Sequence, residues 1–164
     1  MPKIFSFVAR VYLFIGISLG ASFAQGQTTC SFSSAAGVAF GIYDDSSSVP
    51  RDTTTNLAIN CTRNGGPQKL NVTVSLGPSA TSGSINNRSM REGGGSTIAY
   101  NLYRDNSRGL IWGQTPGVDT MTQSLSIPNG STVSTTFTIF GRIGALQNAR
   151  VGTYSDSAVA TVSY

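Results

Sequence analysis

Apolar residues recur at every second position in five segments of this chain, and this alternation constrains the fold more than any other feature. In residues 69–77, Leu70, Val72, Val74 and Leu76 fall on one face, with polar residues between them. The same period appears in residues 56–62, 97–105, 132–143 and 157–164. A period of two, rich in β-branched and aromatic residues, is typical of half-buried strands. Because no stretch after residue 24 carries an apolar stripe with helical spacing, the sequence predicts an all-β protein.

Clusters of turn-forming residues separate the alternating segments. They contain Gly, Asn, Pro and Ser and fall at residues 64–67, 77–84, 92–95 and 128–131. Roughly seven short strands around one core predict an immunoglobulin-like β-sandwich, with a small barrel as the alternative. Residues 63–69 join two alternating segments, so we interpret them as a hairpin connection. The only tryptophan, Trp112, lies among glycines and turn formers in residues 105–120, and we expect it in the core rather than at an exposed binding site.

The first 24 residues have the pattern of a secretory signal peptide. The pattern consists of the early charges Lys3 and Arg10, an apolar run over residues 11–20, and the small residues Ser22 and Ala24. A transmembrane helix is the alternative, but it needs about 18 or more uninterrupted apolar residues, and Arg10 interrupts the run. The sequence therefore predicts a signal peptide over residues 1–24, one exported domain over residues 25–164, and no stable membrane insertion after cleavage.

The chain has two cysteines, Cys30 and Cys61, and an exported protein with two cysteines is expected to form one disulfide. Closing a loop of this length contributes about 3–4 kcal/mol in the loop-entropy model. A two-thiolate metal site is the alternative, but the chain has no histidine to complete it. We therefore expect no metal and no cofactor.

Charge and residue types argue against nucleic-acid binding and catalysis. Loss of Lys3 and Arg10 with the signal peptide lowers the formal net charge from +4 to +2, and the remaining arginines are scattered, so we expect no nucleic-acid partner. Without histidine there is no ordinary Ser–His or Cys–His nucleophile pair. Asp44 and Asp45 are adjacent carboxylates, but the sequence YDDSSS around them is typical of a turn. We expect a protein that is not an enzyme.

Four stretches of the chain resemble the spore coat protein U domain family. They are CSFSSAAGVAFGIYD at residues 30–44, INCT at 59–62, INNRSMREGGGSTIAYNLYRDNSRGLIWG at 85–113, and FGRIGALQNARVGTYSDSAVATVSY at 140–164. The resemblance carries a first and a second cysteine, an Arg-x-Met, a Tyr-x-Leu-Tyr, a Trp-Gly, and a Gly-x-Tyr-x-Asp in that order. It spans nearly the whole chain after the signal peptide.

The resemblance implies a structural role at a bacterial surface. The family includes subunits of archaic, Csu-type chaperone–usher pili of Gram-negative bacteria and some spore coat proteins. Such pilus subunits have an immunoglobulin-like fold that lacks its last strand. A periplasmic chaperone lends a strand, an outer-membrane usher assembles the fibre, and the neighbouring subunit then donates its own strand in donor-strand complementation. The implied location is the periplasm and then the cell surface, with a role in adhesion or biofilm formation.

The last alternating segment is the predicted strand-acceptor edge. It ends at the chain terminus, so we expect no following strand to cover its inner face, which carries Ala158, Ala160, Val162 and Tyr164. Donating a strand takes roughly ten residues at about 3.3 Å per residue. Only residues 25–29, none of them apolar, lie between the predicted cleavage site and Cys30. We therefore predict a subunit that accepts a strand without donating one and sits at the tip of a fibre; the alternative is a secreted or spore-coat-type module that does not polymerise.

Overall fold

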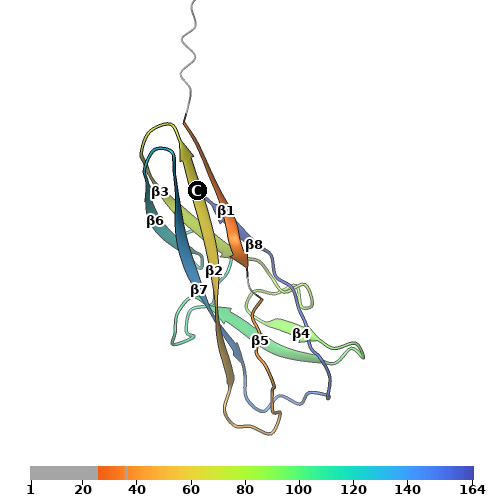
Figure 1. The fold of residues 1–164 in the computed structure, drawn as a ribbon. Coiled ribbons are helices and arrows are strands. Elements are labelled where there is room, and N and C mark those ends of the chain that lie inside the picture. The colour runs from red at the N-terminus through yellow and green to blue at the C-terminus, as the bar shows by residue number, and fades with distance from the viewer. Residues whose placement is uncertain (1–25, 36) are drawn as a thin grey trace, which may run out of the picture.

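The alternating segments form strands in the computed structural model, which describes residues 26–35 and 37–164 (Figure 1). The predicted signal peptide, residues 1–24, lies outside the described residues. The strands are β1 (Gln27–Ala35), β2 (Arg51–Asn64), β3 (Gln68–Leu76), β4 (Arg88–Arg91), β5 (Thr97–Tyr103), β6 (Met121–Ile127), β7 (Ser131–Ile143) and β8 (Ala160–Ser163). The predicted all-β, immunoglobulin-like sandwich is confirmed.

The strands make two antiparallel sheets. One has the order β1-β2-β7-β5-β4 and the other the order β6-β3-β8. The predicted hairpin at residues 63–69 is wrong, because β2 and β3 belong to different sheets. Residues 65–67 instead cross between the sheets, and the Asn129 side-chain oxygen accepts hydrogen bonds from the N–H groups of Gly65 and Gly66. Alternation on both sides of a turn shows that two strands exist, but it does not say which strand each one pairs with.

Inward-facing residues of both sheets form one core. Trp112 is fully buried, as predicted, and its indole N–H donates to the Val74 carbonyl at 2.9 Å. Its ring lies 6.3 Å from that of Phe137, which is also fully buried. The wide loop that contains Trp112 is therefore tied into the centre of the sandwich.

Arg88 is the unexpected member of the interior, because its side chain is fully buried. Its guanidinium donates to the Asn101 side-chain oxygen at 2.6 Å and to the carbonyls of Trp112 and Gly77 at 2.8 and 2.9 Å. Burial lowers the pKa of Arg88. These bonds satisfy carbonyl groups where the chain leaves the sheets, so Arg88 fixes the position of β4.

Candidate acceptor groove between the sheets

The disulfide fixes the edge strand β1. Cys30 and Cys61 stand directly opposite in the β1–β2 ladder and are bonded to each other, so the predicted disulfide is confirmed. Residues Gln27–Thr29, which precede Cys30, already pair with Thr62–Asn64 of β2. Within the described part of the chain, β1 pairs with β2 alone. Its second edge faces the side of the sandwich where β8 lies.

Residues 154–163, which we call the rim segment, run extended along both sheets and are bonded on one side. Ser155 exchanges two backbone hydrogen bonds with Arg91, at 2.9 and 3.0 Å. The carbonyls of Ser157 and Val159 each accept a backbone hydrogen bond at 2.8 Å, from Ala80 and Gly77. The rim segment then continues as β8, which pairs with β3. Every second residue of this segment therefore directs its N–H and C=O toward the sheets.

The alternate residues of the rim segment, which lie between those bonded to the sheets, direct their backbone N–H and C=O groups away from the sheets. The reason is that the bonding side alternates from one residue to the next along an extended strand. These residues include Ala158, Ala160 and Val162, three of the four predicted acceptor positions, and their side chains are half-buried. Tyr164, the fourth, lies beyond the end of β8 and is 55% exposed. Among the described residues, β8 pairs only with β3. The rim segment is thus an open edge whose inner side chains already face the core.

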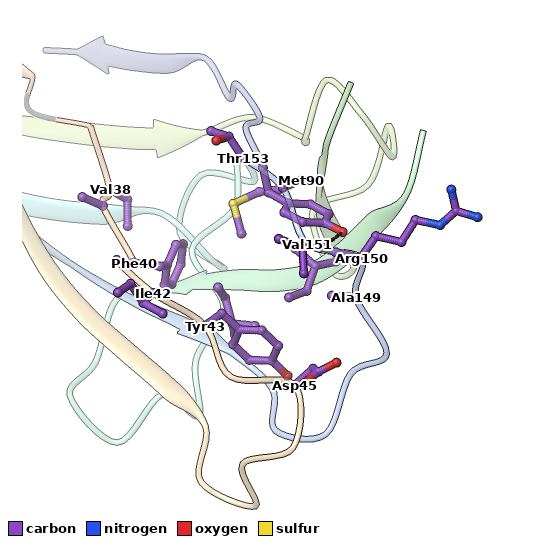
Figure 2. Close-up of a pocket in the computed structure, with 16 residues that line it drawn as sticks. Val38, Phe40, Ile42, Tyr43, Asp45, Met90, Ala149, Arg150, Val151 and Thr153 are labelled. Carbon is purple, nitrogen blue, oxygen red and sulfur yellow. Dashed lines mark hydrogen bonds between the residues drawn. The ribbon is translucent and has the colours of Figure 1, made fainter. Parts of the chain in front are cut away.

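Two cavities open beside this edge, where β1 has given way to irregular chain. The larger, of about 600 Å³, lies between residues 38–45 and 149–154 (Figure 2). The smaller, of about 420 Å³, lies between residues 37–40 and 154–160. The two share four lining residues, Val38, Phe40, Met90 and Tyr154. We call the two adjacent cavities together, bounded by residues 37–45 and 149–160, the groove.

The groove has an apolar floor and an exposed apolar rim. Ile98 and Ile143 of the core line its larger cavity. On opposite sides of that cavity, Ile42 is 90% exposed and Val151 is fully exposed. Large apolar side chains facing water on both sides of an apolar cavity are typical of a surface that another chain covers.

Charged groups are few in the groove. Asp45 and Arg150 line the larger cavity and are exposed, while Asp156 lines the smaller one. Asp156 accepts hydrogen bonds from the Tyr100 hydroxyl at 2.7 Å and the Thr81 N–H at 3.0 Å. Burial raises the pKa of Asp156, but these bonds outweigh it and hold the pKa below its ordinary value. Burial, followed by the contact with Asp156, raises the pKa of Tyr100.

The adjacent carboxylates form a turn, as predicted. An Asp44 carboxylate oxygen accepts hydrogen bonds from the N–H and hydroxyl of Ser46, at 2.9 and 2.7 Å, and these bonds lower the pKa of Asp44. Within residues 26–35 and 37–164 no group of three His, Cys, Asp or Glu side chains is placed to hold a metal ion. The same residues contain no helix long and apolar enough to cross a membrane.

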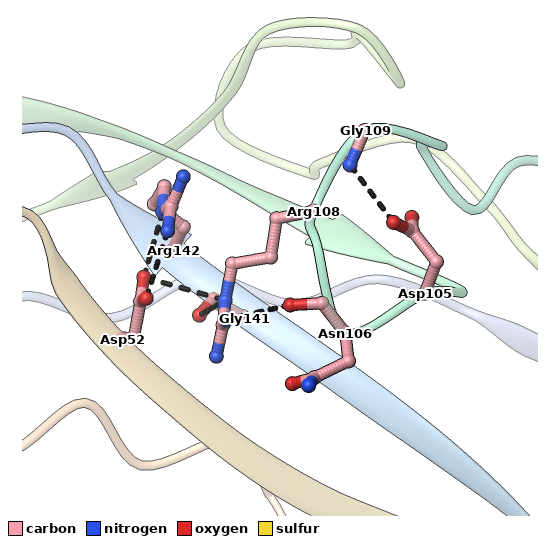
Figure 3. A network of polar contacts seen from close by, with 7 residues as sticks. All are labelled: Asp52, Asp105, Asn106, Arg108, Gly109, Gly141 and Arg142. Atoms are coloured by element: carbon pink, nitrogen blue, oxygen red, sulfur yellow. Dashed lines mark hydrogen bonds and ion pairs between the residues drawn. The ribbon is translucent and has the colours of Figure 1, made fainter.

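The loop at residues 105–120 is clamped to the outer face of the large sheet (Figure 3). Arg108 contacts the Asp52 carboxylate at 3.3 Å, and Arg142 of β7 contacts the same carboxylate at 2.7 Å. At the start of the loop, the Asp105 carboxylate accepts hydrogen bonds from the Ser107 hydroxyl and from backbone N–H groups, which lower the pKa of Asp105 to about 2. This polar network lies away from the groove and holds the loop in place.

The chain was compared with solved structures, with curated proteins and with models of protein families. A chain from the crystal structure of a CsuC–CsuE chaperone–tip adhesion subunit pre-assembly complex, from archaic chaperone–usher Csu pili of Acinetobacter baumannii, superposes with a TM-score of 0.54 at 18% identity. A chain from a chaperone–tip adhesin complex of CFA/I fimbriae gives a TM-score of 0.41 at 10% identity. The alignments cover 84% and 82% of this chain but only 40% and 41% of those chains. No match was found among curated proteins. The model of the Spore Coat Protein U domain matches residues 17–161, and the chain therefore belongs to that family.

Proposed function

We propose that this protein is a structural subunit of a chaperone–usher pilus that completes its fold by accepting a strand from another protein. The observation that carries the proposal is the combination of the open edge of the rim segment with the groove beside it. The backbone of Ala158, Ala160 and Val162 offers hydrogen bonds to an incoming strand, and the cavities offer space for its apolar side chains. Adding a strand in this way is an established mode of peptide recognition.

The physical reason for accepting a strand is that the edge of the rim segment has unpaired backbone groups and no residues that would block pairing. An unpaired strand edge is a template for pairing with other chains, and proteins usually blunt it with lysine, proline or a covering loop. The rim segment, YSDSAVATVS, contains neither lysine nor proline. A strand of about ten residues would pair with the whole segment. The mechanism is burial of apolar surface and completion of a sheet, and it involves no catalysis.

The proposed partners follow from family membership. They are a periplasmic chaperone that lends the first strand, an outer-membrane usher, and a neighbouring subunit that donates the final strand. Export through the predicted signal peptide would bring the chain to the periplasm of a Gram-negative bacterium and then to the cell surface. A chaperone complex of a tip adhesion subunit is what the similar solved structure contains, and this supports the choice of partner.

We place the subunit at the tip of the fibre, with a role in adhesion or biofilm formation. Predicted cleavage after Ala24 leaves five residues before Cys30, and Gln27–Thr29 are engaged in pairing with β2. A segment that is already part of its own sheet is not free to enter the groove of another subunit. The chain would then accept a strand without donating one.

A thermal melt tests the proposal. The full chain is expressed with its own signal peptide, purified from the periplasm, and heated alone or with an uncharged peptide of about ten residues that alternates apolar and polar side chains. At a peptide concentration of about 100 Kd we expect the melting temperature to rise by roughly 10 °C. A matched peptide with proline at the pairing positions, which cannot donate to the ladder, should have no effect.

The thermal melt can also contradict the proposal. A melting temperature that is already high and does not respond to the alternating peptide would mean a self-sufficient sandwich. The alternative, a secreted or spore-coat-type module that does not polymerise, would then replace the pilus subunit.

A further inference from the structure

The wall between the two cavities of the groove is made by four side chains, and three of them are held in place. The Phe40 ring packs edge-on against Tyr100, with ring centres 5.7 Å apart. The Tyr154 hydroxyl is hydrogen-bonded to Ser96 at 3.1 Å and to the Arg150 carbonyl at 2.9 Å. Val38 is β-branched, which restricts its rotamers. Moving any of these three breaks a contact or strains a side chain.

Met90 is the fourth, and it is the movable part of the wall. Its backbone is fixed, because Met90 pairs with Ile98 of β5 and its neighbour Arg91 pairs with Ser155 of the rim segment. Its side chain is half-buried, has no polar atom to tether it by a strong hydrogen bond, and turns about three bonds. Figure 2 shows the Met90 thioether reaching into the larger cavity toward Phe40. Methionine adapts to neighbours of different shape more readily than any other apolar residue.

We propose that Met90 is a specificity-determining residue that sets the size of the apolar side chain an incoming strand places in the groove. This inference rests on the proposed function. In one rotamer the thioether separates the cavities of about 600 and 420 Å³, and in another it yields space to a bulky side chain. The wild-type groove then accepts aliphatic and aromatic side chains with similar affinity.

Charge complementarity identifies the occupant as the extended, uncharged part of a partner protein. The three charged residues that line the groove are Asp45, Arg150 and Asp156. Asp156 is engaged by Tyr100 and Thr81, and the two others are exposed at the surface of the larger cavity. A charged side chain placed on the apolar floor would be desolvated without a partner. The central residues of the entering strand are therefore apolar at alternate positions and carry no charge.

Substitutions at Met90 separate this role from a purely structural one. Met90→Ala removes Cγ, Sδ and Cε from the shared wall and joins the cavities, whereas Met90→Leu keeps the volume but stiffens the side chain. Met121→Ala is the matched control, since Met121 is also half-buried against the core but lies in β6, outside the groove. All three are made in the full chain and purified from the periplasm.

The probes are alternating, uncharged peptides of about ten residues that differ at one guest position, which holds valine, leucine, phenylalanine or tryptophan. Their Kd values are measured by fluorescence anisotropy. For the wild type we expect leucine and phenylalanine guests within about threefold of each other. For Met90→Ala we expect the ratio of phenylalanine to valine affinity to rise about tenfold, the scale on which an apolar site discriminates small size differences. Met90→Leu should selectively weaken binding of the peptide with the tryptophan guest. Met121→Ala should leave the order of the four peptide affinities unchanged.

Two outcomes overturn the inference in different ways. If Met90→Ala changes all affinities by one common factor, the order of the guests is independent of Met90 and the inference is wrong, while the proposed function stands. If no alternating peptide binds the wild type, the proposed function fails and this inference fails with it. If the order of the peptide affinities changes only in the Met90 variants, the result supports both the proposed function and the role of Met90.

Discussion

The two long sides of the sandwich differ, because one is closed by contacts between the sheets and the other is partly open. On one side, which we call the closed seam, β6 of the small sheet meets β7 of the large sheet. The Gln123 side-chain amide donates to the Thr136 carbonyl at 3.1 Å, and its oxygen accepts a hydrogen bond from the Thr135 hydroxyl. On the other side, the open seam, β1 and β8 approach each other, and the groove opens beyond them.

The side chains along the two seams explain the difference. The inner face of β6 carries Leu125 and Ile127, which are buried together with Phe137 of β7. The corresponding face of the rim segment carries Ala158, Ala160 and Val162, which are half-buried. Large side chains fill the space between two sheets, and small ones leave part of it empty. The open seam therefore has an edge that is ready for pairing and a core that is short of side-chain volume.

Replacing one phenylalanine on each side is the strongest test of this comparison. Phe137→Ala empties a fully packed site and should cost about 3–5 kcal/mol in the free energy of unfolding. Phe40→Ala should cost less, about 2–3 kcal/mol, because Phe40 is buried but borders both cavities, so that part of its ring faces empty space. Urea unfolding measures both values.

A bound strand sharpens the same test. With the alternating peptide present, Phe40 gains neighbours, so the cost of Phe40→Ala should rise toward that of Phe137→Ala. The peptide should leave the cost of Phe137→Ala unchanged. Equal costs for the two substitutions without peptide would show that the groove side is as well packed as the closed seam.

The disulfide provides the next largest effect, because it fixes β1 beside the open seam. Replacing Cys30 and Cys61 together by alanine should lower the free energy of unfolding by about 3–4 kcal/mol. Reducing the wild type with a thiol should have the same effect, and Cys61→Ser should sharply lower the periplasmic yield. An unchanged urea midpoint in the double variant would mean that the β1–β2 ladder holds β1 without the covalent bond.

The strands that carry a clear alternation were predictable from the sequence. Residues 56–62, 69–77, 97–105, 132–143 and 157–164 correspond to β2, β3, β5, β7 and β8. Period-two spacing records directly which side chains face the core, and this holds for Leu57, Ile59 and Cys61. The pairing of β2 with β7 and β1, rather than with β3, depends on contacts that a single strand's pattern does not contain.

Two of the strands that the alternation did not identify, β4 and β6, have polar residues on their inner faces. In β6 the alternating set includes Gln123, which serves as the hydrogen-bonded contact of the closed seam. In β4, Arg88 faces inward on the same side as Met90 and is stabilised by carbonyl groups rather than by apolar neighbours. A pattern of apolar and polar residues hides such positions, because the partners that make burial possible come from distant parts of the chain.

The groove was only partly predictable. Ala158, Ala160 and Val162 could be located on one face of the last alternating segment. The lining residues Phe40, Met90 and Tyr154 were present in the family motifs, but nothing in their spacing indicated that they share a wall. Cavities arise where side chains are missing, and a sequence does not record empty space. The use of these residues as an acceptor site stays a prediction.

The amide contact of the closed seam should have a moderate effect. Gln123→Ala removes the hydrogen bonds to Thr136 and Thr135 and should cost about 1–2 kcal/mol in the free energy of unfolding. Affinity for the alternating peptide should stay constant, since Gln123 lies on the side of the sandwich away from the groove. A Thr122→Ala variant on the outer face of β6 is the matched control and should cost less. Altered peptide affinity in Gln123→Ala would show that the two seams are coupled.

The smallest expected effect is that of replacing Asp156, the one carboxylate of the rim segment. The folded-state pKa of Asp156 is lowered, so the carboxylate contributes stability that is complete above its ordinary pKa of about 4 and is lost as the pH falls through the folded-state pKa. Asp156→Asn should therefore be less stable than the wild type by about 1 kcal/mol at neutral pH, and the difference should shrink steadily below about pH 4. Urea unfolding between neutral and acidic pH measures this. A difference that stays constant with pH would mean that Asp156 positions Tyr100 and Thr81 by shape alone, and that its charge has no part in holding the open edge against the large sheet.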